Sequence, residues 1–483
     1  MPVQTTIIEQ APLYRILPVG QEIIFVVSND DAVANQLQVK FIAEVHIGAG
    51  AINLSSSADI IGTFKTTPNN AGVGIFDLSN VIENYVKSDN MAATGSKYKL
   101  TTTSDNDRHP IHLIDQFSQS GNVARFMAIQ FKVEYQGATT CAGVQDPNVV
   151  ATQCQTAENS VEYTLFNGYV KDTDNIRRGV APFPANFGFD MNEFEPVVTF
   201  PTANTIKFLT NSPTTVDANL EDYGTFGIYQ FDNASNVHEI RIMYYGSDDS
   251  ALGNETITKD TSTGAFNTWS VDAEKQVIYL GAFPGNLQNS STTFKALVTA
   301  NTIQGGYYTI NARNNASLPS TASYRINVKC PDLRGYASIR LCWINQWGVW
   351  DYYTFTKKST RTLNTSRTTY TQLAGTWNER LYRTDSYKGG KKAFRNNGLE
   401  KIIINTDFVS EEFNTMFEEL SNSPEVYMLQ GYQDDTPFSN LSTYVTPVRL
   451  TSNSFTYKTV ANDKLIQYAF EIEKSKTLKT QSV

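Results

Sequence analysis

Strict alternation of apolar and polar residues is the feature of this sequence that most limits its fold. From residue 127 to 135 every second residue is apolar: Met127, Ile129, Phe131, Val133 and Tyr135. Successive side chains of a β-strand point to opposite faces, so this pattern predicts a strand with one face in a core. The same alternation recurs over 323–329 and 466–473. The chain is therefore predicted to be mainly β.

The composition agrees with a mainly β chain. Charged residues make up 18% of the 483 residues and aromatic residues 12%, whereas an average domain is about 25% charged. Aromatic and uncharged polar side chains suit pleated, half-buried surfaces. At roughly 100–200 residues per domain, the length predicts about three domains. We therefore expect a multi-domain protein of β-sandwiches or barrels, with a few short helices packed on the sheets.

Turn signals and strand patterns divide the sequence into three predicted domains. Residues 1–200 are expected to form an N-terminal β domain with two long polar loops, at about 88–121 and 136–160. Residues 201–330 form a predicted central β-sandwich, and residues 331–483 a predicted C-terminal β domain. The strands expected in the central domain cover residues 237–245, 276–281, 294–300, 306–310 and 323–329. Polar loops of this length inside a domain are typical of segments that bind a partner or move.

A short amphipathic helix is predicted near residue 80. Leu78, Val81, Ile82 and Tyr85 follow the i, i+3, i+4, i+7 spacing of one helix face. Asp77 precedes them and can accept a hydrogen bond from an unpaired N–H group at the helix start. We expect this helix to pack against a sheet through its apolar face.

A second amphipathic helix is predicted over about residues 411–421, in the C-terminal domain. Its apolar positions are Phe413, Met416, Phe417 and Leu420. Ser410 is expected to cap its start, and Pro424 to end it. Its acidic residues are expected on the solvent face: Glu411, Glu412, Glu418 and Glu419.

Several functional classes find no support in the sequence. The 39 basic and 48 acidic residues give a net charge of −9, which argues against a nucleic-acid-binding protein. No apolar run is long enough for a transmembrane helix, and the N-terminus lacks the basic start of a signal peptide. Motifs for phosphate-binding loops, dinucleotide-binding folds, serine hydrolases and zinc proteases do not occur. We expect no enzyme activity and no cofactor.

Two groups of residues invite a metal interpretation that the spacing does not support. His109, His112 and Asp115 are loosely spaced, and a zinc site needs three or four convergent ligands. Asp172 and Asp174 resemble the start of a calcium loop, but the glycine and glutamate that such a loop requires are missing. We expect ordinary loop residues at both places and no bound metal.

The four cysteines divide into two pairs. Cys141 and Cys154 lie in the second polar loop, where a disulfide would restrain the chain. Free thiols are the default for a protein made in the cytoplasm, so both alternatives stay open. Cys330 and Cys342 fall on the apolar phase of predicted strands and are expected in the core.

The densest aromatic segment, WINQWGVWDYYTF at 343–355, allows two interpretations. Exposed rings would form a stacking platform for sugars or single-stranded bases. Alternatively, the rings form a buried core or a subunit interface, because Trp and Tyr are prominent in both. We favour a core or an interface and take the following residues as interface candidates: Trp343, Trp347, Trp350, Tyr352 and Tyr353.

Residues 357–401 form a basic stretch inside this acidic chain. Eleven Lys or Arg against three acidic residues give a local net charge of +8, which leaves −17 for the remainder. This polarity favours head-to-tail self-association or docking onto an acidic protein over nucleic acid. A solvated face is the remaining alternative. The interface candidates here are Lys357, Lys358, Arg361, Arg367, Trp377, Lys391 and Lys392.

Three segments resemble the virion proteins of tailed bacteriophages that infect Bacteroidetes or occur in marine samples. The first is FKTTPNNAGVGIFDLSNVIENYV at 64–86, in which a Pro/Asn turn precedes "FDLS" and a helix. The second is the "WxNxxGxWDxxxF" pattern within 339–370, and the third is the helix–strand unit at 406–429. The resemblance covers the first 90 residues and most of 331–475.

The resemblance implies a tail hub, ring or baseplate protein that assembles in symmetric copies with itself and with other tail proteins. It would be made in the host cytoplasm and then reside in the virion tail. The alternative is a receptor- or glycan-binding module that uses the central sandwich and the aromatic segment. A depolymerase-like enzyme is a third hypothesis, which requires paired carboxylates brought together by the fold.

Overall fold

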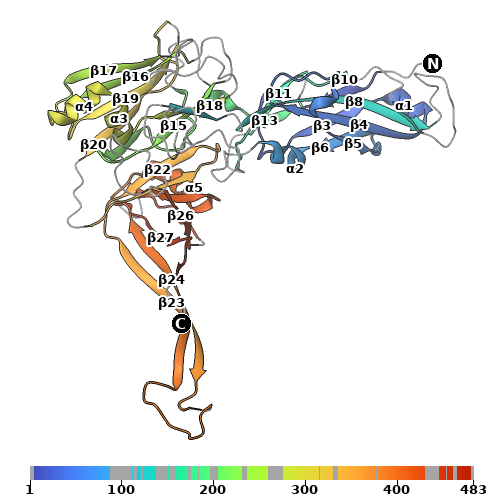
Figure 1. Cartoon of the computed structure of the whole chain (residues 1–483). Coiled ribbons are helices and arrows are strands. Elements are labelled where there is room, and N and C mark those ends of the chain that lie inside the picture. The colour runs from blue at the N-terminus through green and yellow to red at the C-terminus, as the bar shows by residue number, and fades with distance from the viewer. Residues whose placement is uncertain are drawn as a thin grey trace.

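The structure is a computed structural model and confirms a mainly β, multi-sheet protein with a few short helices (Figure 1). It describes residues 5–86, 111, 117–120, 123–136, 150–152, 158–171, 176–182, 184–195, 205–230, 237–258, 276–314, 316–329, 336–376, 378–429, 445–452, 454–460 and 465–479. Within these residues the strands form six sheets. No helix in this part of the chain has the length and apolarity needed to cross a membrane.

Two sheets form an N-terminal sandwich. Phe25 and Phe76 from the smaller sheet pack against Phe131 of the larger one, with ring centroids 5.6 and 5.8 Å apart. The smaller sheet contains β1 (Ile7–Gln10), β3 (Ile24–Ser28) and β6 (Val73–Asp77). The larger sheet contains β2 (Ile16–Pro18), β11 (Tyr163–Phe166), β8 (Ala124–Gln136), β4 (Leu37–Gly48) and β5 (Ile60–Thr66), with β9 (Val150–Thr152) and β10 (Glu158–Asn159) also paired to β8.

The strand predicted from the 127–135 alternation is confirmed as the central part of β8. Met127, Ile129, Phe131 and Val133 are fully buried in the sandwich core. Its other face is less exposed than alternation alone predicts, since Ala128 and Glu134 are buried as well.

The helix predicted near residue 80 is confirmed but short. It comprises α2 (Ser79–Ile82) and a 3-10 turn (Glu83–Tyr85). Asp77 Oδ1 accepts a hydrogen bond from Ser79 N at 3.0 Å, as the capping prediction required. Tyr85 is exposed, because the tightened last turn rotates it away from the sandwich. Further helical segments in the described N-terminal residues include α1 (Asp30–Asn35) and the 3-10 turn Ser57–Asp59.

A small sheet and a hairpin connect the sandwich to the rest of the chain. The sheet contains β15 (Thr225–Gln230), β18 (Gln276–Gly281) and β7 (Phe117–Ser120). The hairpin contains β12 (Ile176–Arg178) and β13 (Phe187–Phe189), followed by the 3-10 turn Met191–Glu193. Pairing of β7 with β18 joins residues from both sides of the predicted boundary near residue 200.

A five-stranded central sheet follows, with two helices on it. The strands, in sheet order, are β14 (Thr215–Asn219), β20 (Tyr324–Lys329), β19 (Tyr307–Arg313), β16 (Glu239–Tyr245) and β17 (Ala251–Thr258). The helices are α3 (Pro284–Ser290) and α4 (Thr292–Thr299). Four of the five predicted central strands are confirmed by β16, β18, β19 and β20.

The strand predicted at 294–300 is wrong, because this segment is helix α4. Ser291 caps it: its Oγ accepts a hydrogen bond from Phe294 N at 2.9 Å. Phe294, Leu297 and Val298 then pack on the core with helical spacing. A short apolar run is compatible with either a strand or a helix, and the Ser291 cap favours the helix.

The C-terminal sheet has eight strands. In order along the main path they are β22 (Trp350–Phe355), β21 (Ile339–Ile344), β25 (Val426–Leu429), β26 (Val445–Leu450), β27 (Ala469–Lys474), β24 (Gly390–Asn405) and β23 (Thr360–Gln372), with β28 (Leu478–Lys479) paired to β24. The predicted helix is confirmed as the 3-10 turn Glu411–Phe413 and α5 (Asn414–Asn422), which buries Met416, Phe417 and Leu420.

Two details of the α5 prediction are corrected. Ser410 stands before the first turn, but its side chain makes no capping hydrogen bond. Glu419 is not on the solvent face and is only 5% exposed. Its side chain contacts Asn211 and the backbone of Gln346, which belong to distant parts of the chain and keep it from solvent.

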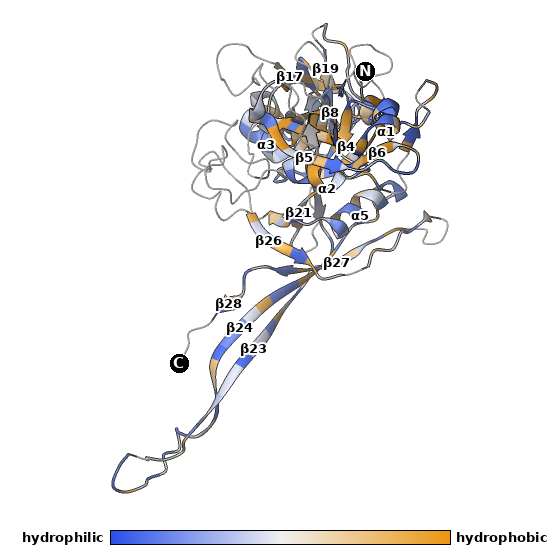
Figure 2. Cartoon of the chain, turned by 90° about the vertical axis from the view of Figure 1, so that its right-hand side faces the viewer, coloured by the Kyte–Doolittle hydropathy of each residue, from blue (hydrophilic) through white to orange (hydrophobic). Residues whose placement is uncertain are grey.

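The paired strands β23 and β24 project far from the rest of the molecule (Figure 1). We call β23, β24 and the segment between them, residues 360–405, the arm. Hydrophilic and hydrophobic residues are interspersed along both strands (Figure 2). Every residue of β23 except Gln372 is exposed.

Candidate assembly surface

The predicted aromatic interface candidates are core residues. Trp343, Trp347, Trp350 and Tyr352 are 0%, 2%, 1% and 7% exposed, and Tyr353 is half-buried. The core alternative is therefore confirmed for the first four. A stacking platform made of them is excluded, because their rings are covered by other parts of the same chain.

Asn345 explains the "WxNxxGxWD" pattern. Its Oδ1 accepts hydrogen bonds from Trp347 N at 2.9 Å and Val349 N at 3.2 Å, which shapes the turn between β21 and β22. Its Nδ2 donates to Leu209 O at 2.9 Å and to Asp351 Oδ2 at 3.1 Å. One buried side chain thus links the turn to the segment before β14.

Gly348 sits where the turn meets the N-terminal part of the chain. Its φ is +69°, and a Cβ there would lie 2.4 Å from Asn167 Nδ2 and 2.5 Å from Asn167 O. Any larger residue is therefore excluded by both backbone conformation and space. Beside it, Trp347 packs against Phe189 and Phe194, with ring centroids 5.5 and 4.5 Å away.

Two buried carboxyl groups lie at this junction. Asp351 Oδ1 accepts a hydrogen bond from Thr210 Oγ1 at 2.6 Å. Glu419 Oε1 accepts from Asn211 Nδ2 at 2.7 Å and from Gln346 N at 3.3 Å. Glu419 Oε2 is buried and has no hydrogen-bond partner in the described part of the chain. The sequence carries no sign of this pair, because its members are far apart and only folding brings them together.

Burial dominates the protonation of this pair. Burial and the negative charge of Asp351 raise the pKa of Glu419 well above its usual range, against the opposing effects of Asn211 and Lys171. Burial also raises the pKa of Asp351, although Thr210 and Asn345 donate hydrogen bonds to it. The pair therefore favours holding a proton near neutral pH.

The basic candidates lie on or beside the arm. The arm is a long antiparallel ribbon of two strands. β23 and β24 pair from Thr360↔Ile403 to Gln372↔Gly390, with one irregularity after Thr368. Outside this pairing, β24 pairs with β27 and β28 near its base. β23 is the last strand of the sheet, and no described strand pairs with its outer edge.

The acidic residues of the arm are all neutralised by ion pairs. Glu379 pairs with Arg383 at 2.7 Å and Asp385 with Lys388 at 2.9 Å. Glu400 pairs with Lys474 at 2.9 Å. The positive charges left over therefore determine the field of the arm.

Most of the predicted basic candidates remain available on the surface. Arg361, Arg367 and Lys391 are exposed and form no ion pair with the described residues. Lys392 donates to Tyr387 O at 2.9 Å, and Lys357 pairs with Asp407 at 2.8 Å at the base of the arm. Lys358 is exposed, and Trp377 lies outside the described residues.

The arm also exposes large apolar and aromatic side chains. Leu363 packs over Gly398, where a Cβ would lie 3.0 Å from its Cδ1, yet the leucine stays 55% exposed. Further exposed members are Tyr370, Leu373, Leu381, Tyr382, Tyr387 and Phe394. A ribbon with basic and apolar groups on a free edge has the composition of a protein-binding surface.

A polar cleft of about 930 Å³ lies beside the sandwich. Glu22 and Glu83 line one side of it, and Arg178 and Ile176 come from the β12–β13 hairpin. Tyr169 also lines the cleft and donates from its hydroxyl to Glu83 Oε1 at 3.2 Å. The cleft thus combines carboxylates, a cation and a half-exposed aromatic ring.

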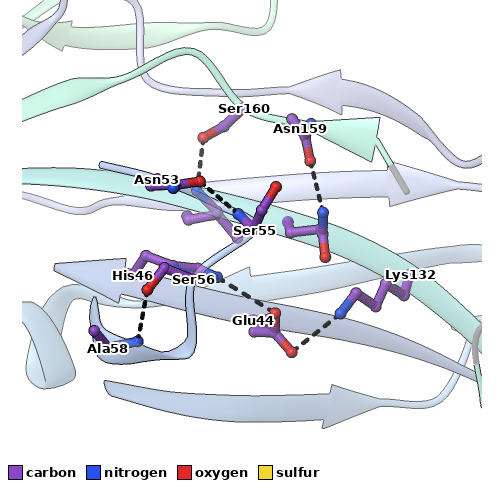
Figure 3. Close-up of polar contacts among 11 residues, drawn as sticks. Glu44, His46, Asn53, Ser55, Ser56, Ala58, Lys132, Asn159 and Ser160 are labelled. Atoms are coloured by element: carbon purple, nitrogen blue, oxygen red, sulfur yellow. Dashed lines mark hydrogen bonds and ion pairs between the residues drawn. The ribbon is translucent and has the colours of Figure 1, made fainter. Parts of the chain in front are cut away.

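A second polar group lies on the larger sheet of the sandwich (Figure 3). Glu44 Oε2 accepts from Lys132 Nζ at 3.0 Å, and Glu44 Oε1 lies 3.3 Å from His46 Nε2. Nearby, Gln130 Nε2 donates to Asn159 Oδ1 at 3.2 Å and joins β8 to β10. These contacts bridge neighbouring strands and account for the charged residues there.

The metal and cysteine predictions are tested only in part. No cluster of three or more His, Cys, Asp or Glu side chains suits a metal within the described ranges. His109, His112, Asp115, Asp172 and Asp174 lie outside them, as do the cysteines Cys141, Cys154 and Cys330. Cys342 is a free, fully buried thiol, as predicted.

Comparisons with known proteins add little to the geometry. No protein-family model matches the chain, and no curated protein matches it. Extracellular domains 3–5 of Drosophila OTK align over 83% of this chain and 92% of theirs, at 11% identity and a TM-score of 0.17. An E. coli and a Salmonella alpha-2-macroglobulin align at 9% identity over 100% and 99% of this chain, but over only 31% and 30% of their own, with TM-scores of 0.18 and 0.16. Likeness at this level supports no conclusion about function.

Proposed function

We propose that this chain is a non-enzymatic structural component of a tailed-phage virion, in the tail hub, ring or baseplate. It would assemble with copies of itself and with other tail proteins through the arm. The resemblance of residues 64–86, 339–370 and 406–429 to phage virion proteins supports the virion assignment. The projecting arm is the observation that carries the assembly role.

The arm has no core of its own that would justify its length. An isolated two-stranded ribbon is at best marginally stable in water. Leu363, Leu381 and Tyr387 are 55%, 75% and 72% exposed on it. Covering such groups on a neighbour would recover about 25 cal/mol for each Å² of apolar surface removed from water. Stable multi-subunit assembly is the function that best explains this exposure.

Particle assembly with a shortened arm tests the proposal. Residues 368–395 would be replaced by a two-residue turn, which joins the paired residues Arg367 and Asn396, in a phage that carries only this copy of the gene. We expect the purified variant to fold and the yield of infectious particles to fall by at least about a hundredfold, since the contacts of the arm would be lost. Normal yield, or absence of the chain from purified virions, would contradict the proposal.

Recognition of host glycan is a second candidate, and the polar cleft favours it. A sugar ring can stack on Tyr169, while Glu22, Glu83 and Arg178 offer acceptors and donors to its hydroxyl groups. The test is binding of the full chain to host cells before and after Tyr169→Ala, with the exposed arm residue Tyr387, changed to Ala, as the control. Loss of binding in the first variant alone would support a glycan site in the cleft.

A further inference from the structure

The outer edge of β23 has few of the features that usually protect an exposed strand: one irregularity after Thr368 and two arginines. Its sequence, TRTLNTSRTTYTQ, contains no proline and no acidic residue, and its only charges are Arg361 and Arg367. Protected edges are usually short, bulged, or interrupted by proline or inward-pointing charge. At the opposite edge of the same sheet, Tyr352 of β22 contacts Thr225 of β15 through their hydroxyl groups at 3.1 Å.

β17 is also an outer strand, and the segment that contains it is acidic. β17 pairs with β16 on one side, and no described strand pairs with its other side. Asp248, Asp249 and Glu255 lie in the turn and strand covering 246–258, which contains no basic residue. Of the other outer strands, β5 is nearly as long but carries Lys65.

These two edges are complementary in charge. Two strands that pair bring opposite side chains to about 4.5–5.5 Å, where unlike charges attract and like charges repel. Pairing β23 with another β23 would bring arginines together, whereas pairing it with β17 brings Arg361 and Arg367 toward acidic groups. Charge therefore selects between two geometrically similar pairings.

The two edges are far apart within one molecule. β17 lies at the outer end of the central sheet, and the arm projects from the C-terminal sheet in another direction (Figure 1). Pairing between them consequently requires two copies. Such a contact joins different surfaces of each copy, so repetition gives a ring if the rotation closes and a filament otherwise.

We propose that the open edge of β23 in one copy of this chain pairs with the open edge of β17 in a second copy, so that copies associate head to tail. This inference rests on the proposed function in that both require self-association, and it specifies the partner and the two strands. Main-chain hydrogen bonds would supply affinity, and the charges would supply selectivity.

Light scattering on the full chain tests this pairing. The unmodified protein is expected to have an apparent mass of at least twice 53.8 kDa, and the mass should fall at high salt. The variant Arg361→Glu with Arg367→Glu should associate at least about tenfold more weakly. The control Arg380→Glu with Lys391→Glu makes the same charge change on the arm but off β23, and should associate normally.

Rescue decides whether β17 is the partner. Ala251→Lys with Asn254→Lys places two cations at exposed positions of β17. These changes should weaken association alone and restore it when combined with the Arg361→Glu and Arg367→Glu changes. Circular dichroism would confirm that all variants fold.

Three outcomes would overturn the inference: a monomer at every concentration, association that ignores the β23 changes, and an absence of rescue. The proposed function fails separately, if the chain is missing from purified virions. A self-associating protein that does not need β23 would therefore refute the strand pairing and leave the virion role standing.

Discussion

At the residue scale, a few buried polar groups hold segments together that are distant in the sequence. Asn345 contacts the backbone at Trp347, Val349 and Leu209, and Gly348 allows the turn to approach Asn167. Glu419 of α5 and Asp351 of β22 are bonded to Asn211 and Asn345 at the same junction. A buried carboxyl pair in this position makes stability depend on pH.

Glu419→Gln should remove much of that dependence. Because burial and Asp351 raise the pKa of Glu419 in the folded state, the folded protein binds this proton more tightly than the unfolded chain does. Stability therefore falls as pH rises above the ordinary value of 4.5. Glutamine keeps the acceptor without the charge, so the variant should be more stable at about pH 8, by on the order of 2 kcal/mol, and little changed at about pH 5. Urea denaturation at both pH values measures this, and an equal effect at both would contradict it.

Trp347→Ala should destabilise the protein by about 3–5 kcal/mol, as large-to-small changes in cores do. Its indole packs against Phe189 and Phe194 and is 2% exposed. If Trp347 were an interface residue instead, the same substitution would weaken assembly and leave the stability of the fold unchanged. The matched control is Tyr387→Ala, whose ring is 72% exposed, and which should change the unfolding free energy by less than about 0.5 kcal/mol. Similar effects of both changes on urea denaturation would contradict the core assignment.

At the element scale, the arm contributes a surface and little stability. Its strands pair with each other over Thr360–Gln372, and only the base of β24 pairs with β27 and β28. The described large apolar groups of its outer part, between Leu363 and Phe394, remain exposed, whereas Ile402 and Ile404 at its base belong to the C-terminal core. We therefore expect the arm to contribute to contacts with other molecules more than to the stability of the fold.

Shortening the arm should therefore leave thermal stability almost unchanged. With residues 368–395 replaced by a two-residue turn, we expect the melting temperature to shift by no more than about 2 °C, because the lost contacts lie within the arm itself. A shift of about 10 °C or more in a thermal melt would show that the arm stabilises the body of the protein.

At the scale of the whole molecule, the three predicted regions are linked more closely than the sequence suggests. β7 pairs with β18, and Lys171 pairs with Glu418 at 2.8 Å. Asn211 bonds to Glu419, which lies 208 residues further along the chain. The body of the protein thus contains several inter-region contacts, while the arm projects from it, an arrangement suited to reaching a neighbour.

The sequence by itself determined the fold class, most strands and both predicted amphipathic helices, because these depend on local periods of 2 and 3.6 residues. It also indicated the basic stretch, whose charge needs no folding to be counted. Only the tertiary structure decided that the aromatic segment is core, that 294–300 is a helix, and that Glu419 is buried beside Asp351. Each of these depends on which distant segment covers a residue. The open edges of β23 and β17 belong to the same class, since only strand order in the folded sheets reveals an edge.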